Sequence, residues 1–391
     1  MERPGSSRSA WLGPLAAGFV AVLVGFSSSA VIVFQAAASA GATPAQVGSW
    51  ILALCVGMAI TSIGPSLYYR KPVLTAWSTP GAALLSVGLV GVPMSQAIGA
   101  FIVCGALTAL VGITGWFERS MSKIPLPIAS AMLAGVLLRF GLDLFVAARA
   151  QLGLVLPMFL VYLVLKRFAP RYAVIGVLVL GTLIAASQGL LHTEALNLQL
   201  TVPEFVAPTF DPAVLIGVGI PLFVVTMASQ NVPGVVIMRN AGYATNVSPL
   251  ITLTGVVTLL LAPFGAFALN LAAITAAICM GPEAHADPAR RYWAAVAAGG
   301  FYLVAGLFGA TVVAFFTAFP KELIMALAGL ALLSTIATGL SGAMADDTQR
   351  EPALVTFLVT ASGLSLFGIG SAFWGLLAGL LAKAVLGGGR R

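Results

Sequence analysis

The polar side chains best suited to bind a ligand lie in the middle of apolar segments, and they are uncharged. Thr226, Ser229, Gln230 and Asn231 occur together near the centre of the apolar run 212–237. Such groups are costly in lipid unless they face protein or water. Because hydroxyls and amides bind by hydrogen bonding, the cluster predicts a site for a polar or anionic small molecule. Hydrogen bonding between helices is the alternative interpretation.

Two short apolar runs hold the remaining candidates. Residues 78–90 and 271–281 are too short to cross a bilayer core of about 30 Å, and an extended piece precedes each run. The start of a helix carries unpaired N–H groups and a partial positive charge, which favour an anion. Ser78 and Thr79 could instead serve only as helix caps. The residues expected to contact substrate are Ser78, Thr79, Gly81, Ser229, Gln230, Asn231, Asn270, Leu271, Ala272, Ala273, Phe26 and Gln35.

Few groups in this sequence could carry a proton or a metal. Glu283 and His285 lie just after the second short run, and histidine titrates near neutrality. Asp143 follows Arg139 by four residues, so an ion pair on one helix face is the simpler interpretation. These three residues, Glu283, His285 and Asp143, are weaker candidates for proton coupling. The three cysteines occur singly, so we expect no metal site, disulfide framework or cofactor.

The composition is that of a membrane protein. Hydrophobic residues make up 60% of the 391 residues and charged residues 8%, against roughly 25% charged in a soluble domain. Spanning-length apolar stretches recur from Trp11 to Leu386. The first ten residues lack a cleavable signal pattern, so we expect the stretch from Trp11 to be a retained span.

The formal charge of +7 follows membrane topology and does not indicate nucleic-acid binding. Lysine and arginine fall at alternate breaks between apolar runs, apart from Arg139, Arg149 and Lys321. This positive-inside pattern predicts a multi-pass protein of a bacterial-type inner membrane with both termini in the cytoplasm. An even number of crossings follows.

The order of segments repeats roughly 200 residues apart, with one full span, an extended piece and a short helix in each half. Seven crossings are an odd number, so the second copy must lie inverted in the membrane. We therefore predict an all-α polytopic membrane protein with repeats at 1–190 and 191–391. The expected segments are 11–38, 46–66, 78–90, 95–117, 125–146, 151–166, 172–190, 212–237, 247–266, 271–281, 292–317, 323–341, 352–368 and 371–386.

Several strings resemble the benzoate–proton symporter family, the most specific being RKPVLTAWSTPGAAL (70–84) and NLAAITAAICMGPEAHADPARRYWAA (270–295). The family is similar in architecture to uracil–proton symporters and to sulfate/anion exchangers. The resemblance implies 14 segments, with segments 3 and 10 as half-helices preceded by short strands. It also implies a core domain (about 11–117 plus 212–317), a gate domain (about 125–190 plus 323–386) and a possible homodimer.

The resemblance implies a secondary active transporter that takes up benzoate or a related aromatic carboxylate with a proton, by alternating access, and not an enzyme. Uracil symporters carry glutamates where this chain has TMASQNVPG and FALNLAAIT. The lack of a carboxylate fits an anionic substrate, which a fixed negative charge would repel. We expect the substrate carboxylate on the N–H groups of 79–82 and 271–273. A transporter of another organic anion or a nucleobase, and a passive anion channel, remain alternatives.

Overall fold

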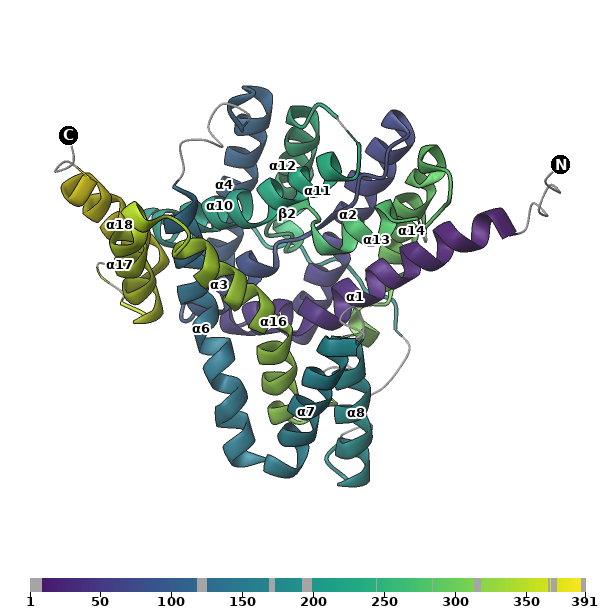
Figure 1. The fold of residues 1–391 in the computed structure, drawn as a ribbon, viewed down its shortest axis with the longest axis horizontal. Coiled ribbons are helices and arrows are strands. Elements are labelled where there is room, and N and C mark those ends of the chain that lie inside the picture. Colours follow the sequence, from purple (N-terminus) through teal and green to yellow (C-terminus); the bar gives the residue numbers. More distant parts are fainter. Residues whose placement is uncertain are drawn as a thin grey trace.

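The computed structural model describes residues 9–117, 125–168, 173–191, 199–243, 245–282, 284–312, 318–364, 366 and 371–387. This part of the chain is predominantly helical (Figure 1). Five described helices are long and apolar enough to cross a bilayer, or six if the bent α1 counts as one span. Other apolar helices are shorter, including Ser248–Phe264 and Trp374–Leu386.

The helices follow the order expected from the sequence. The first half contains α1 (Ser9–Ser39), α2 (Pro44–Tyr69), β1 (Thr75–Trp77), α3 (Thr79–Gly88), α4 (Met94–Ile113), α6 (Leu126–Ala150), α7 (Leu152–Phe168) and α8 (Ala173–Ser187). The second half contains α9 (Pro212–Val214), α10 (Ile220–Thr226), α11 (Val232–Asn240), α12 (Ser248–Leu261), β2 (Leu269–Leu271), α13 (Ile274–Met280), α14 (Tyr292–Leu307), α16 (Lys321–Ala343), α17 (Arg350–Ala361) and α18 (Ser371–Gly387).

Two segments differ from their expected form. The first span is bent by 42° between Trp11–Phe26 and Ser29–Ser39, where the Ser29 hydroxyl donates back to Gly25 O at 2.8 Å. The second short helix begins at Ile274 and not at residue 271, since Leu271 still belongs to β2. Hydropathy alone predicts neither the bend in the first span nor the later start of the second short helix.

The two strands pair with each other although they lie in opposite halves of the chain. They run antiparallel in the register Thr75↔Leu271, Ala76↔Asn270 and Trp77↔Leu269. The ladder continues past their ends, where Ser78 N donates to Ala268 O at 3.0 Å. Buried backbone groups must be paired inside an apolar protein, and each strand satisfies the other. The pairing brings the start of α3 close to the start of α13.

A row of hydroxyl groups fixes β1 on α2. The Thr75 hydroxyl hydrogen-bonds with those of Thr61 at 2.6 Å and Ser62 at 2.8 Å, and the Thr75 amide donates to Ser62 Oγ. Ser66, one helical turn after Ser62, bonds to both backbone groups of Val73. On the other side, Leu269 N donates to Thr258 Oγ1 of α12 at 3.1 Å. The strands therefore have a fixed position between α2 and α12.

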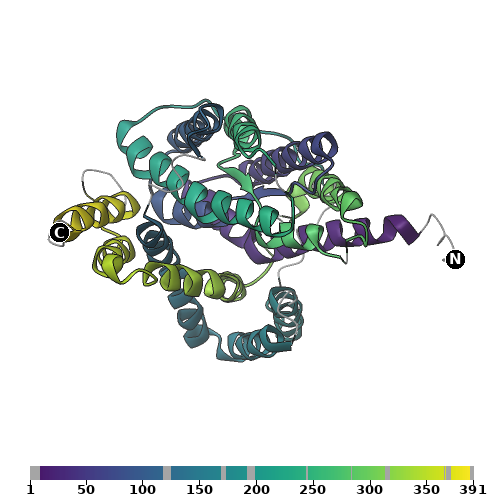
Figure 2. The ribbon, with the colours of Figure 1, turned by 45° about the horizontal axis from the view of Figure 1, so that its top comes forward.

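The helices pack in two groups. In the first group α2 packs on α14, α4 on α12, and α1 on α3 and α14. In the second group α6 packs on α16 and α17, and α7 on α8. Figures 1 and 2 show α6, α7 and α8 extending away from the first group, with α17 and α18 at the end opposite the N-terminus. Close packing of α4 on α12 requires glycine, because a Cβ on Gly105 would lie 2.9 Å from Leu259 N.

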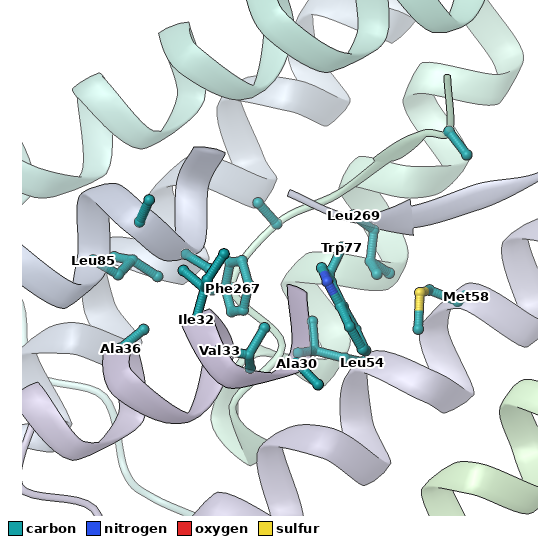
Figure 3. Close-up of a cluster of buried hydrophobic side chains, with 14 of the residues drawn as sticks. Ala30, Ile32, Val33, Ala36, Leu54, Met58, Trp77, Leu85, Phe267 and Leu269 are labelled. Carbon is teal, nitrogen blue, oxygen red and sulfur yellow. The ribbon is translucent and has the colours of Figure 1, made fainter. Parts of the chain in front are cut away.

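Buried side chains fill the space around the paired strands. Figure 3 shows Trp77 and Leu269 together where the strands meet, with Met58 of α2 beside them. Phe267 packs with Trp50 and Phe101, with ring centroids 6.1 Å from each. Because Phe267 is fully buried in this cluster, it belongs to the core and does not form part of an aromatic binding slot.

Candidate functional site

A cavity of about 400 Å³ lies where the two strand–helix units meet. This volume falls within the range of small-molecule sites. Both groups of helices contribute, since α16 supplies part of the wall. Its lining residues are Gly25, Ser29, Met58, Ala76, Trp77, Thr79, Pro80, Ser229, Gln230, Pro233, Ile237, Ala272, Ala273, Thr275, Tyr302, Leu332, Ser334 and Thr338.

The described lining carries hydrogen-bonding groups but no formal charge. Hydroxyls come from Thr79, Thr275, Tyr302 and residues of α16, and an amide comes from Gln230. Lysine, arginine, aspartate, glutamate and histidine are absent from these lining residues. An anion in this cavity would therefore be held by hydrogen bonds and by the partial charges of helix starts.

At the start of α3, one residue caps the helix and its neighbour lines the cavity. Ser78 is fully buried, and its Oγ accepts from Gly81 N at 3.1 Å. Thr226 Oγ1 donates to the same oxygen at 2.9 Å. Thr79 lines the cavity, whereas Ser78 and Gly81 lie behind the wall. Ser78 is thus a capping residue that also ties α3 to α10.

The polar cluster of the second half occupies a π-helical turn, Met227–Asn231. Such turns shift the direction of the side chains and are frequent at functional sites. Ser229 and Gln230 line the cavity, but Asn231 is fully buried. Asn231 Oδ1 accepts from Leu271 N at 2.9 Å. The cluster therefore combines lining residues with one residue that fixes the second strand.

Close approach of Leu271 to this helix depends on Gly234. A Cβ at Gly234 would lie 2.7 Å from Leu271 Cβ and 3.0 Å from Leu271 O. Any larger residue at this position would push the strand away from the helix. Leu271 itself is fully buried, so its role is in positioning and its side chain does not line the cavity.

Asn270 does not cap the second short helix, contrary to the expectation from the sequence. It lies within β2, and its Nδ2 donates to Leu271 O at 2.9 Å. Helix α13 follows Ala273 and has no side-chain cap. Asn270 is paired with Ala76 of β1, but unlike Ala76 it is fully buried and does not line the cavity. Its Oδ1 is buried without a partner in the described part of the chain.

Most of the amides expected to hold the substrate carboxylate already donate to protein atoms. Gly81 N is bonded to Ser78, Ala82 N to Ser78 O, and Leu271 N to Asn231. Ala272 N donates to Leu74 O at 2.9 Å as part of the ladder. An anion in the cavity would therefore depend on side-chain donors and on the other N–H groups of 79–82 and 271–273, because strand pairing and capping use these four.

Three aromatic residues shape one side of the cavity. Trp77 lines it, and its indole N–H donates to Ser29 Oγ at 2.8 Å. Phe26 packs edge-on against Trp77 with ring centroids 4.9 Å apart, so Phe26 supports the wall but does not line it. Tyr302 was not singled out from the sequence. It is 2% exposed and lines the cavity.

The remaining candidates lie away from this cavity. Gln35 is half-buried on α1 and does not line it. Asp143 is half-buried on α6, and the structure gives no ion pair between it and the exposed Arg139. His285 lines a different cavity, where its Nδ1 accepts from Asp287 N at 3.0 Å. Glu283 lies outside the described residues.

Solved structures similar to this chain are anion transporters with little sequence identity. The transmembrane domain of a cyanobacterium bicarbonate transporter, BicA, matches with a TM-score of 0.57 and 14% identity, over 94% of this chain and 97% of that one. The murine Slc26a9 anion transporter matches with a TM-score of 0.55 and 14% identity, over 99% and 69%. These matches show a shared helical membrane fold. The neighbours are therefore transporters of the BicA and Slc26a9 type and not of the uracil-symporter type that the sequence also led us to expect.

Sequence comparison gives the family. A family model described as benzoate membrane transport protein matches residues 9–385. Inner membrane protein YdcO of Escherichia coli (strain K12) is 52% identical over 372 residues, which is 95% of each chain. Benzoate membrane transport protein of Acinetobacter baylyi (strain ATCC 33305 / BD413 / ADP1) is 41% identical over 95% of this chain and 94% of its own. The chain therefore belongs to the benzoate membrane transport protein family and is a membrane transporter.

Proposed function

We propose that this transporter takes up benzoate or a related aromatic carboxylate together with a proton, by alternating access across the inner membrane. The observation that carries the proposal is the uncharged cavity at the meeting point of β1–α3 and β2–α13. Its donors suit a carboxylate, and its apolar wall suits a ring. The name of the 41% identical relative from Acinetobacter baylyi points to the same substrate.

Within the cavity, the carboxylate would lie toward the polar side. Thr79, Ser229 and Gln230 offer side-chain donors there, and Ala272 and Ala273 bring the start of α13 alongside. The ring would lie against Trp77 and Met58. Ser78, Gly81, Asn231, Asn270 and Leu271 hold the two strand–helix units in place behind the wall. Two helix starts of partial positive charge then offset the cost of burying an anion without a fixed cation.

The proposed mechanism is a rocking movement of two domains. We assign the 14 segments to a core, about 11–117 plus 212–317, and a gate, about 125–190 plus 323–386. Packing of α2 on α14 and of α4 on α12 supports a repeat, because α14 and α12 occupy the places of α4 and α2 in the second half, so the same contact occurs twice. The α16 part of the cavity wall lies in the gate, so a shift of the gate would open the cavity to one side or the other. Both termini would be cytoplasmic, and a homodimer is compatible with this arrangement.

Proton coupling would require a group outside the cavity lining that the structure describes, or a proton carried by the substrate. Glu283, His285 and Asp143 are the side-chain candidates for carrying the proton.

The alternative function is transport of another small organic anion or a nucleobase. The uncharged donor set favours this alternative as much as benzoate, because hydroxyls and amides bind many polar ligands. A passive channel for anions is the third possibility.

Uptake into proteoliposomes tests the proposal. Purified protein is reconstituted, an inward proton gradient is imposed, and entry of radiolabelled benzoate is followed with and without an ionophore that collapses the gradient. We expect concentrative uptake that needs the gradient, and inhibition by unlabelled benzoate but not by uracil. Uptake that only equilibrates would indicate a channel. Competition by uracil or bicarbonate, but not by benzoate, would assign a different substrate.

A further inference from the structure

A second cavity, of about 570 Å³, lies at the N-terminal end of α1, between the end of α2 and the loop before α14. It shares no lining residue with the substrate cavity. Two arginines, Arg70 and Arg290, form part of its wall, and aromatic rings of Trp11, Tyr292 and Trp293 form another part. This combination is not used by the transport mechanism above.

Acidic side chains among the described residues neutralise little of the positive charge of the two arginines in this cavity. Arg70 is exposed and makes no ion pair with any described residue. Arg290 Nε lies 3.8 Å from Asp287 Oδ2, and both side chains are more than half exposed, so water largely screens their attraction. The cavity therefore presents a net positive charge to an incoming ligand.

Hydrogen bonds from Arg291 and Tyr243 hold the loop that carries Arg290 in place. Arg291 donates from Nε to His285 O and from Nη1 to Met280 O, each at 2.8 Å. The Tyr243 hydroxyl donates to Pro288 O at 3.0 Å. These bonds position the loop without using the Arg290 guanidinium, which leaves that group available at a preformed site.

Arg70 occupies a backbone conformation that favours another residue type. It ends α2 in the left-handed region with φ 51°, and among the described residues it is the one non-glycine residue with positive φ. Glycine is the usual residue at such a helix end, because an L side chain is strained in this conformation. The backbone conformation therefore gives no reason for an arginine here, and we look for the reason in what its side chain binds.

An exposed apolar face begins at the same cavity. Trp11, Leu15, Phe19 and Leu23 are spaced by four residues on α1, and all four are exposed. Trp11 contacts Trp293 edge-on at 4.9 Å, so this face and the cavity share one residue. From Trp11 to Leu23 the helix rises by about 18 Å, close to the depth of one leaflet of the hydrocarbon core.

We propose that this cavity binds the phosphate headgroup of an anionic phospholipid, whose acyl chains lie along the exposed face of α1. Arginine is suited to phosphate, and tryptophan and tyrosine favour the headgroup level. A free phosphate ion would use the arginines but not the apolar face, so the continuity of the two features favours a lipid. The positive-inside pattern puts this end at the cytoplasmic leaflet, where anionic lipids attract basic groups.

Native mass spectrometry of the full-length protein in detergent tests this site. The probes are phosphatidylglycerol and phosphatidylcholine with identical acyl chains, with soluble glycerol phosphate as competitor. We expect preferential retention of phosphatidylglycerol, lowered about five-fold by either Arg70→Gly or Arg290→Gln. Arg70→Gly should not unfold the protein, since glycine suits the backbone of that position. The matched control is Arg350→Gln, which removes another exposed arginine paired with an aspartate three residues before it.

Three outcomes would overturn the proposal. The first is equal retention of the two lipids by the wild-type protein. The second is unchanged phosphatidylglycerol retention in both cavity variants, or an equal loss in Arg350→Gln. The third is displacement of the lipid by glycerol phosphate at equal concentration, which would show a site for a free phosphate group. A thermal midpoint for each variant close to that of the wild type establishes that a loss of lipid reports on the site.

Discussion

Asn231 Oδ1 accepts a hydrogen bond from the amide of Leu271 at 2.9 Å, and this bond joins the π-helical turn of one segment to the strand before α13. Both groups are fully buried. The bond uses a side chain that the sequence suggested as a ligand, and it fixes the backbone on which Ala272 and Ala273 enter the cavity wall. Positioning of the substrate site therefore depends on a contact behind that wall.

Replacement of Asn231 by leucine should destabilise the protein. It leaves the buried Leu271 N–H without an acceptor, at a cost of about 1–3 kcal/mol. Benzoate affinity should fall as well, because the start of α13 loses its support. Thermal unfolding and ligand binding of the purified protein measure the two effects. Asn246→Ala serves as the control, because it removes the acceptor of an exposed amide, Ser248 N, which water can replace; it should cost less stability and leave affinity unchanged. Wild-type stability of Asn231→Leu would show that the bond contributes little.

Tyr302→Phe should weaken benzoate binding while leaving the fold intact. The substitution keeps the ring in the cavity wall and removes only the hydroxyl, so the packing around Tyr302 is retained. A hydrogen bond to a carboxylate contributes about 1.5–3 kcal/mol, which corresponds to roughly a 10- to 100-fold loss of affinity. Isothermal titration of both proteins gives this ratio. Equal affinities would remove Tyr302 from the set of ligands.

Gly25→Ala should raise stability and lower affinity together. The added Cβ would lie 3.7 Å from the Tyr302 hydroxyl and 3.8 Å from Thr275 Cγ2, which is ordinary contact, but it would occupy space in the cavity. Alanine also favours a helix over glycine by up to about 1 kcal/mol. The matched control is Gly300→Ala on α14, where a Cβ meets nothing within 4 Å. It should raise stability without a change in affinity, and a loss of affinity in both variants would contradict the assignment.

Ser78 and Thr79 should respond differently to substitution, although they are neighbours. Ser78→Ala removes the cap of α3 and the acceptor of Thr226, so unfolding should become easier by about 0.5–2 kcal/mol. Thr79→Val keeps the shape of a cavity-lining residue and removes only its hydroxyl, so affinity should fall with little change in stability. Denaturant unfolding and binding assays on both variants make the comparison. The reverse pattern would mean that Ser78 is the ligand.

Glu283→Gln tests the proton route. If the carboxyl of Glu283 carries the proton, uptake of benzoate should continue down its own gradient but should no longer respond to an imposed pH step. The measurement is proteoliposome uptake at several external pH values, with His285→Gln assayed in parallel. Coupling that is fully retained in both variants would place the proton on another group or on the substrate itself.

The sequence alone determined the features that depend on local chemistry. Its hydropathy fixed a polytopic membrane protein, because a bilayer accepts only long apolar segments. The Ser78-Thr79-Pro80 string predicted where α3 begins, since hydroxyl caps and an early proline act within one turn. The polar cluster in the apolar run 212–237 predicted a small-molecule site, and two of its members, Ser229 and Gln230, line the cavity.

Tertiary structure decided which of the candidate groups face the cavity. Asn231 and Asn270 are both asparagines within apolar segments, yet one supports Leu271 and the other lies in β2 with an oxygen that has no partner among the described residues. Tyr302 became part of the site only because α14 packs beside the bend of α1. The register of β1 on β2 and the contribution of α16 join residues far apart in the chain. Side-chain packing between helices sets such contacts, and no local pattern encodes them.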